Sequence, residues 1–149
     1  MVGAAILDSV EQPTRVLAAQ RAYPPALSGL WEFPGGKQEP GESAQDALVR
    51  ECREELDVDV VLLDEVTPPA PEGWPLAGTA VMRVFVAVVT DAPTMDDAAG
   101  DPEALVRVGE DHLAVRLLPL ADPAQILGLP WIPADLPIVA ALLEMLRTE

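Results

Sequence analysis

Short apolar runs alternate with turn residues over the first forty positions of the chain. The runs "VGAAIL" (2–7) and "TRVLAAQR" (14–21) flank the turn-rich "DSVEQP", which predicts a β-hairpin. "GLWEF" (29–33) predicts another strand. "PGGKQEPGE" (34–42) predicts a loop, because paired glycines and two prolines interrupt both helical and strand patterns.

The next segment, from Ser43 to Leu56, has the pattern of a helix. Ser43 with Asp46 three residues later resembles a capping box, and the alanine- and leucine-rich run that follows has good helix propensity. At about 100° per residue, Leu48, Cys52 and Leu56 form one apolar stripe. We expect this stripe to face the core, with Glu55 at its edge.

The rest of the chain adds strands and a closing helix. The pattern predicts strands at 58–66, 79–90 and 113–118, a short helical connection at 119–129 and an amphipathic helix at 136–147. The 79–90 run is the strongest strand signal and is expected to lie centrally in a sheet. Residues 67–78 hold four prolines and predict an irregular connection, and 91–104 predict an acidic, flexible loop. No repeat or second composition regime is present, so we expect one domain over 1–149 with an α+β fold, a mixed β-sheet sandwiched between α-helices.

Composition narrows the classes of partner. The chain has 149 residues and a formal net charge of −16. This charge opposes binding to nucleic-acid polymers and to anionic membranes, because such binders present a basic surface. A polyanionic ligand would need metal ions as bridges.

Cellular context is also suggested by composition. No stretch approaches the roughly 18 apolar residues of a membrane span, and "MVGAAILDSVEQPTR" lacks the basic region of a secretory signal. These features predict a cytoplasmic protein. Cys52 is the only cysteine, which excludes an intrachain disulfide and a cysteine-rich metal site and favours a buried, inert thiol.

The predicted helix at 43–56 concentrates carboxylates. Glu51 and Glu55 are four residues apart, a like-charge pair that weakens a helix. Arg50 can pair with Glu54, but no basic residue stands three or four positions from Glu51 or Glu55. The cluster therefore lacks compensating charge, and hard oxygen ligands of this kind select Mg²⁺, Mn²⁺ or Ca²⁺. The alternative is a solvated acidic face.

The preceding loop makes the pattern specific. Gly36 is followed after five residues by Glu42, and after seven more by "RECREELDV" (50–58). Residues 36–58 resemble the Nudix box, and "GLWEFPGGK" extends the resemblance to the MutT branch of the Nudix hydrolases. One position departs from the box: Asp57 stands where the family has glycine. We expect Asp57 to adopt the left-handed conformation that ends the helix, which Asp tolerates better than most residues.

The resemblance implies a Mg²⁺- or Mn²⁺-dependent enzyme. In such an enzyme the metal ligands would be the carboxylates of Glu51, Glu54 and Glu55 and the carbonyl of Gly35. Arg50 would hold the glutamates in place, and Glu42 would support the site. Glu51 is the preferred general base, although sequence does not separate base from ligand within this trio. A further acidic ligand late in the chain would be Asp111 rather than Glu110. His112 is expected to be structural or to lie at the rim.

Several residues are candidates for substrate binding. The resemblance places Lys37, Gly36 and Arg21 near the phosphates; the alternatives are solvation for Lys37 and a strand-end salt bridge for Arg21. "PWIPADLPI" resembles the segment that reads the nucleobase in MutT-like enzymes, with Asp135 as the reader. An ionised Asp135 can only accept hydrogen bonds, which suits the amino group at cytosine N4. The alternative is that Asp135 is the N-cap of the last helix. The remaining candidates line the base pocket, each with ordinary core packing as the alternative: Phe33, Trp131 and Ile132.

The implied reaction is hydrolysis of nucleoside triphosphates to the monophosphate and pyrophosphate. Candidate substrates are (d)CTP and oxidised nucleotides, with a role in nucleotide-pool sanitation. The alternatives are an enzyme specific for 8-oxo-dGTP, a Nudix hydrolase of ADP-ribose or dinucleoside polyphosphates, and a non-catalytic nucleotide sensor. The expected partner is a small nucleotide, not a nucleic-acid polymer or a membrane. Sequence leaves open whether the chain is a monomer or a homodimer.

Overall fold

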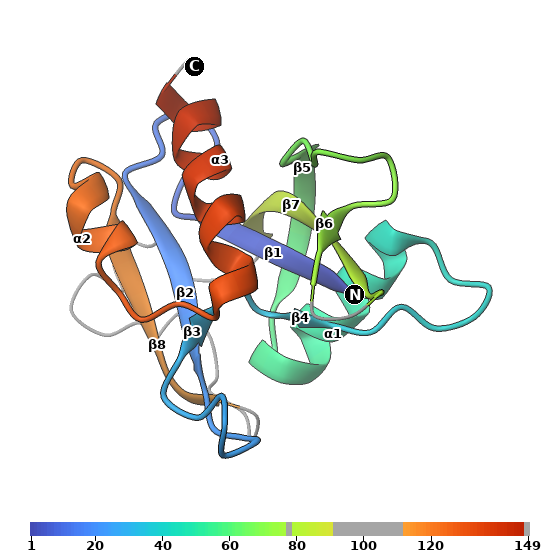
Figure 1. Ribbon diagram of the computed structural model, residues 1–149. Helices are drawn as coiled ribbons and strands as arrows, with labels where there is room; N and C mark the ends of the chain where they lie inside the picture. The colour runs from blue at the N-terminus through green and yellow to red at the C-terminus, as the bar shows by residue number, and fades with distance from the viewer. Residues whose placement is uncertain (77–78, 91–111, 148–149) are drawn as a thin grey trace.

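The computed structural model describes residues 1–76, 79–90 and 112–147 (Figure 1). The elements in chain order are β1 (Val2–Leu7), β2 (Arg15–Arg21), β3 (Trp31–Glu32), β4 (Gly35–Gly36), α1 (Ala44–Leu56), β5 (Asp59–Glu65), β6 (Trp74–Pro75), β7 (Val81–Thr90), β8 (His112–Pro119), α2 (Pro123–Leu127), the 3-10 turn η2 (Pro133–Asp135) and α3 (Leu136–Arg147).

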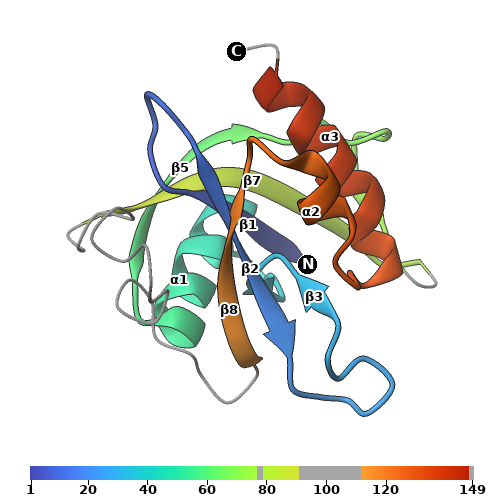
Figure 2. The ribbon, with the colours of Figure 1, turned by 90° about the vertical axis from the view of Figure 1, so that its left-hand side faces the viewer.

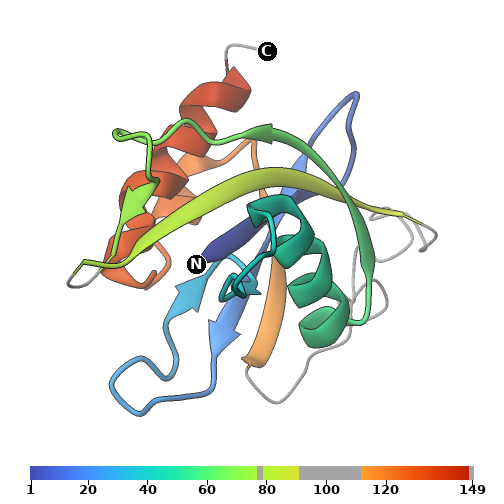
Figure 3. The same cartoon turned by 90° about the vertical axis from the view of Figure 1, so that its right-hand side faces the viewer.

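The strands form one mixed sheet with the order β3-β2-β1-β7-β5. β1 runs parallel to β7 and antiparallel to β2 and β4, while β8 extends the sheet by pairing with β2 along its length. β7 lies between β1 and β5, which confirms its predicted central position. Figure 3 shows β5 and β7 arching over α1.

Two hydrophobic clusters lie on opposite faces of this sheet. All six residues of β1 are buried, so successive side chains contribute to alternate faces. Ala4 and Ile6 belong to the cluster that contains the apolar stripe of α1, whereas Ala5 and Leu7 belong to the cluster that contains α3. Figure 2 shows α1 on one side of the strands and α2 with α3 on the other. The predicted sandwich is therefore confirmed.

The local elements agree with most of the expectations from the sequence. α3 has the predicted bounds, Ser43 caps α1, and the hairpin of β1 and β2 forms. Two short strands were missed. β4 lies in the segment expected to be a loop, and β6 lies in the expected irregular connection. Both are two-residue strands whose pairing depends on distant partners, β1 and β7.

Two expectations concern other parts of the chain. The acidic segment 91–104 lies outside the described residues. Among the described residues, no helix combines the length and the apolar character needed to cross a bilayer.

Candidate active site

The two glycines of β4 allow its backbone to pack closely against β1. A β-carbon at Gly35 would lie 2.0 Å from the carbonyl oxygen of Val2, so no residue with a side chain fits there without moving β1. The amide of Ala4 donates to the carbonyl of Pro34 at 2.8 Å and fixes the start of this segment. The glycine pair therefore serves close backbone packing.

Gly36 leaves room for a carboxylate of α1. A β-carbon at Gly36 would lie 2.3 Å from the carboxyl carbon of Glu51. The Glu51 carboxylate thus rests directly against the backbone of β4. This contact joins the two halves of the sequence motif, the glycine strand and the acidic helix.

The core and both helix ends orient α1. Leu48, Cys52 and Leu56 are buried in the first cluster, as predicted. The Ser43 hydroxyl accepts a hydrogen bond from the Asp46 amide at 3.0 Å. Asp57 ends the helix with φ 56° and ψ 42°, which confirms the predicted left-handed conformation. Burial raises the pKa of Cys52 to about 12, as expected for an inert thiol.

Arg50 lies at the centre of the acidic cluster. Its Nε and Nη2 donate to the two oxygens of Glu42 at 2.9 and 3.0 Å, and Nη2 also donates to the carbonyl of Lys37 at 3.0 Å. Its Nη1 donates to Glu51 at 3.0 Å and to Glu54 at 3.2 Å. One guanidinium therefore ties the loop before α1 to two carboxylates of the helix.

This arrangement corrects one expectation. Spacing along the helix gave Glu51 no basic partner three or four positions away, whereas the family resemblance gave Arg50 the role of holding the glutamates. Arg50, the immediate neighbour of Glu51, does pair with it. The long side chain of Arg50 runs along the helix surface, so positional spacing alone does not describe its reach. The hydrogen bonds that Arg50 donates to Glu42 lower the pKa of Glu42, and the same bonds raise the pKa of Arg50 well above its ordinary value.

The three box glutamates have different exposures. The side chain of Glu51 is 13% exposed and that of Glu54 is 59% exposed, while Glu55 is intermediate. The Oε2 atom of Glu55 is buried and accepts no hydrogen bond, although the residue makes another contact. Glu55 therefore lies at the edge of the buried stripe, as predicted.

The oxygen atoms of the box glutamates are of the kind that bind a hard divalent cation. Glu51, Glu54 and Glu55 supply carboxylate oxygens on one helix, and Gly35 lies on the strand that Glu51 touches. In the described part of the chain, no three acidic, histidine or cysteine side chains converge into a metal-binding group. Arg50 instead draws Glu51 and Glu54 toward its own Nη1. A bound cation would therefore compete with Arg50 for these oxygens.

Two other predicted site residues have different outcomes. Lys37 is exposed, and its carbonyl is held by Arg50. The predicted late ligand Asp111, like its alternative Glu110, lies outside the described residues.

A second polar group surrounds Asp135. Asp135 is only 4% exposed, and its Oδ2 accepts a hydrogen bond from the Phe33 amide at 3.3 Å. Asp135 is the last residue of η2, directly before α3. Its side chain is hydrogen-bonded to Phe33, the residue after β3, and not to the first turn of α3. Burial raises the pKa of Asp135 to about 7; the Phe33 amide and Arg21 oppose this rise, and Glu32 adds to it.

Arg21 forms a salt bridge with Glu32 at the end of β2, which is one of the two roles considered for it from the sequence. Its Nη1 lies 3.2 Å from Glu32 Oε2, and its Nε donates to the carbonyl of Tyr23 at 2.9 Å. Glu32 Oε2 also lies 2.9 Å from Nε2 of His112, which is 5% exposed. A phosphate-binding role for Arg21 stays a prediction.

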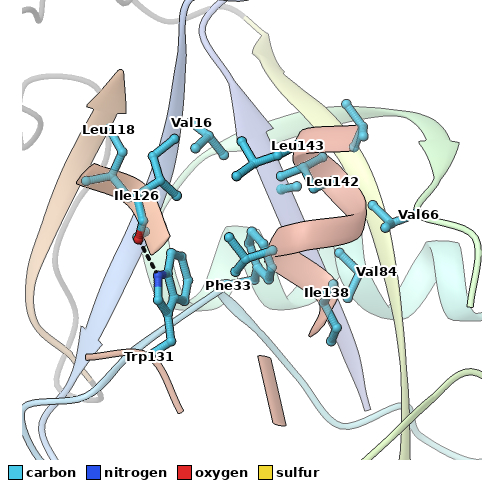
Figure 4. Close-up of a cluster of buried hydrophobic side chains, with 14 of the residues drawn as sticks. Val16, Phe33, Val66, Val84, Leu118, Ile126, Trp131, Ile138, Leu142 and Leu143 are labelled. Carbon is cyan, nitrogen blue, oxygen red and sulfur yellow. Dashed lines mark hydrogen bonds between the residues drawn. The ribbon is translucent and has the colours of Figure 1, made fainter. Parts of the chain in front are cut away.

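The aromatic candidates belong to the second hydrophobic cluster. Phe33 and Trp131 are buried, with ring centroids 5.4 Å apart, and the indole of Trp131 donates to the Ile126 carbonyl at 2.8 Å (Figure 4). Ile132 is partly exposed, and its amide donates to the carbonyl of Trp31 at 2.8 Å. These contacts anchor the "PWIPAD" segment beside β3. They are ordinary core packing, and they also fix the position of Asp135.

Glu32 is the residue that reasoning from the sequence missed. It lies between the buried aromatic residues Trp31 and Phe33 and contacts both Arg21 and His112. The available signal was a charged residue flanked by two aromatic residues in a short strand. A charge at such a position is costly unless it is paired, so it marks a residue that needs partners.

Comparison with known proteins identifies relatives over nearly the whole chain. The NUDIX domain family matches residues 1–140. The chain is 35% identical over 142 residues to a putative 8-oxo-dGTP diphosphatase 2 of Mycobacterium tuberculosis, covering 95% of this chain and 89% of the relative. It is 33% identical over 136 residues to a CTP pyrophosphohydrolase of Escherichia coli, covering 91% and 87%. The solution structure of the E. coli ORF135 protein superposes with a TM-score of 0.69 at 30% identity, covering 99% of this chain and 90% of that one.

Proposed function

The chain belongs to the Nudix family and is a Nudix hydrolase. We propose that it is a Mg²⁺- or Mn²⁺-dependent pyrophosphohydrolase, which converts nucleoside triphosphates to monophosphates and pyrophosphate. The observation that carries the proposal is the Arg50-centred carboxylate cluster packed against the glycines of β4. The two relatives above, named for 8-oxo-dGTP and for CTP, support a nucleoside triphosphate as substrate. In this proposal residues 1–149 act as one domain.

The proposed ligands of the cation are the carboxylates of Glu51, Glu54 and Glu55 and the carbonyl of Gly35. A bound Mg²⁺ neutralises phosphate oxygens and makes a bound water more acidic. The exposed Glu54 can turn toward a cation at little cost, because its side chain is largely in solvent. Lys37, on the loop beside the cluster, is exposed and free to approach a phosphate, with the Gly36 backbone beside it.

Glu51 is the proposed acceptor of the proton from the attacking water. Its carboxylate is held on one side by Arg50 and rests on Gly36 on the other. This double constraint fixes the direction of its oxygens, which a general base requires. Arg50 is in turn fixed by Glu42, so the loop and the helix position the base together.

Asp135 is the proposed reader of the nucleobase. An ionised carboxylate accepts from an exocyclic amino group such as cytosine N4, whereas a protonated carboxyl donates to a carbonyl such as guanine O6. Because the pKa of Asp135 is about 7, both forms are populated near neutral pH. This supports a substrate range that includes (d)CTP and 8-oxo-dGTP, as in nucleotide-pool sanitation, in preference to strict specificity for one base.

A nucleotide panel tests the proposal. Nucleotide products would be separated by chromatography for CTP, dCTP, dGTP, 8-oxo-dGTP, ADP-ribose and a dinucleoside polyphosphate, with Mg²⁺ and with EDTA. For the triphosphates, phosphate release in the presence of pyrophosphatase would be measured as well. We expect turnover of triphosphates only with metal, with a monophosphate as product by chromatography. Preferential turnover of ADP-ribose, or full activity in EDTA, would contradict the proposal.

A further inference from the structure

The Glu32 carboxylate is held by side chains from two other strands. Arg21 of β2 approaches it with Nη1 at 3.3 Å from Oε1 and 3.2 Å from Oε2. His112 of β8 approaches Oε2 with Nε2 at 2.9 Å. The Glu32 side chain is only 15% exposed, so these partners restrict a carboxylate that is largely shielded from solvent.

The sheet brings these three residues together at one end of β2. β3 pairs with β2 through Ala19 and Glu32, and β8 pairs with β2 on its other edge. The register between β2 and β8 shifts between Gln20 and Arg21, so that Arg21 stands opposite His112. Irregular pairing of this kind re-aims side chains and is common beside functional sites.

His112 has little structural reason of its own to be polar. It is 5% exposed, and its Nδ1 is buried with no hydrogen-bond partner. Its Nε2 makes a hydrogen bond with Glu32. Burying an imidazole with one unsatisfied nitrogen disfavours folding, whereas an apolar side chain would pack without that loss. The polar ring is therefore explained by what it does to Glu32.

Hydrogen bonding assigns the tautomer. Glu32 accepts from Arg21 and is an acceptor when ionised, so the Nε2 of His112 carries the hydrogen and donates to it. In the neutral ring Nδ1 is then an acceptor, and it is the nitrogen without a hydrogen-bond partner.

Glu32 stands beside the proposed base reader. The next residue, Phe33, donates its amide to Asp135, and Glu32 is close enough to Asp135 to act on it electrostatically. Any change in the direction of the Glu32 side chain therefore alters the polar groups that face a bound base.

We propose that His112 is a positioning residue: its hydrogen bond holds the Glu32 carboxylate next to the segment that contacts Asp135, and this constraint strengthens binding of the preferred triphosphate. The inference rests on the proposed function, because it assigns a substrate-binding role to this end of the same site. In this proposal His112 acts through its hydrogen bond to Glu32.

Three variants of His112 separate positioning from packing. The amide nitrogen of Gln occupies about the place of Nε2, whereas that of Asn occupies about the place of Nδ1. We expect His112→Leu and His112→Asn to raise KM for the preferred triphosphate about tenfold, the usual scale for losing a hydrogen bond to a charged group. We expect His112→Gln to restore KM to within about threefold, with kcat changing less than KM in all three variants.

A double-mutant cycle with Glu32→Ala decides whether His112 acts through Glu32. If it does, His112→Leu raises KM in the wild-type background but adds no further effect in Glu32→Ala. Melting temperatures and Mn²⁺ titrations of each variant show that the fold and the metal site are retained. Multiplying effects in the double mutant, or a wild-type KM in His112→Leu, would overturn the inference alone. A wild-type protein that hydrolyses no triphosphate would overturn the proposed function and this inference together.

Discussion

Arg50 and Glu42 are joined by a two-pronged ion pair, with Nε 2.9 Å from Oε2 and Nη2 3.0 Å from Oε1. This pair links the loop after β4 to the middle of α1 and leaves Nη1 for Glu51 and Glu54. The planar guanidinium makes all of these contacts at once, which an ammonium group cannot do.

Arg50→Lys therefore tests whether this geometry, and not only the charge, supports the site. We expect kcat/KM to fall about 10- to 100-fold, the scale for losing a residue that orients metal ligands. The matched control is Arg53→Lys on the same helix, because Arg53 pairs with Asp59 at 2.7 Å where both side chains are more than half exposed. Equal effects of the two substitutions would contradict the assigned role of Arg50.

Gly36→Ala probes the contact between β4 and the proposed base. Its new β-carbon would lie 2.3 Å from the carboxyl carbon of Glu51, so the carboxylate must move. We expect kcat to fall at least about 100-fold, on the scale of losing a positioned catalytic group. Gly3→Ala is the control, since its nearest contact would be the Met82 sulfur at 3.4 Å. If Gly36→Ala has normal steady-state kinetics, Glu51 does not act from this position.

Glu54→Gln and Glu55→Gln test metal binding apart from turnover. We expect each to lower kcat at least about 100-fold. Thermal melting without metal should show an equal or higher melting temperature for Glu55→Gln, because a like-charge repulsion with Glu51 is removed. The rise in melting temperature that Mn²⁺ causes in the wild type should shrink in both variants. Glu144→Gln on α3, whose side chain is 68% exposed, should respond to Mn²⁺ like the wild type.

Asp135→Asn tests the protonation of a buried carboxyl. The folded pKa is about 7, above the ordinary value of 3.8, so stability from this group is complete below about pH 4 and is lost as the pH rises through 7. Asn cannot ionise and should remove that loss. We expect the melting temperature of Asp135→Asn, relative to wild type, to increase between pH 5 and pH 8. A difference that is constant with pH would show that Asp135 does not change protonation in this range.

The same residue predicts a pH-dependent choice of substrate. In the proposed role, the carboxylate that is ionised above pH 7 would accept a hydrogen bond from cytosine N4, and the carboxyl that is protonated below pH 7 would donate one to guanine O6. The ratio of kcat/KM for dCTP to that for 8-oxo-dGTP should therefore rise with pH in the wild type and stay flat in Asp135→Asn. The ratio is the proper measurement, because pH effects on the metal site are common to both substrates. A wild-type ratio that does not change between pH 6 and pH 8 would remove Asp135 from base recognition.

The sequence by itself determined the features that depend on local periodicity and on fixed spacing. The helix from Ser43 to Leu56, its buried stripe and its left-handed end at Asp57 follow from residues that are neighbours on one element. The motif at 36–58 likewise identified the family, because its residues recur at fixed intervals along one loop and one helix. Such features need no knowledge of distant contacts.

Only the tertiary structure decided how separate segments meet. The strand at Gly35 exists because β1 lies against it, and the pairing of Arg50 with Glu42 depends on how the loop folds back on α1. The contact of Asp135 with Phe33 joins residues 102 positions apart. Burial of a carboxyl and the direction of a side chain are properties of all the elements packed around it, so neither periodicity nor spacing along the chain could reveal them.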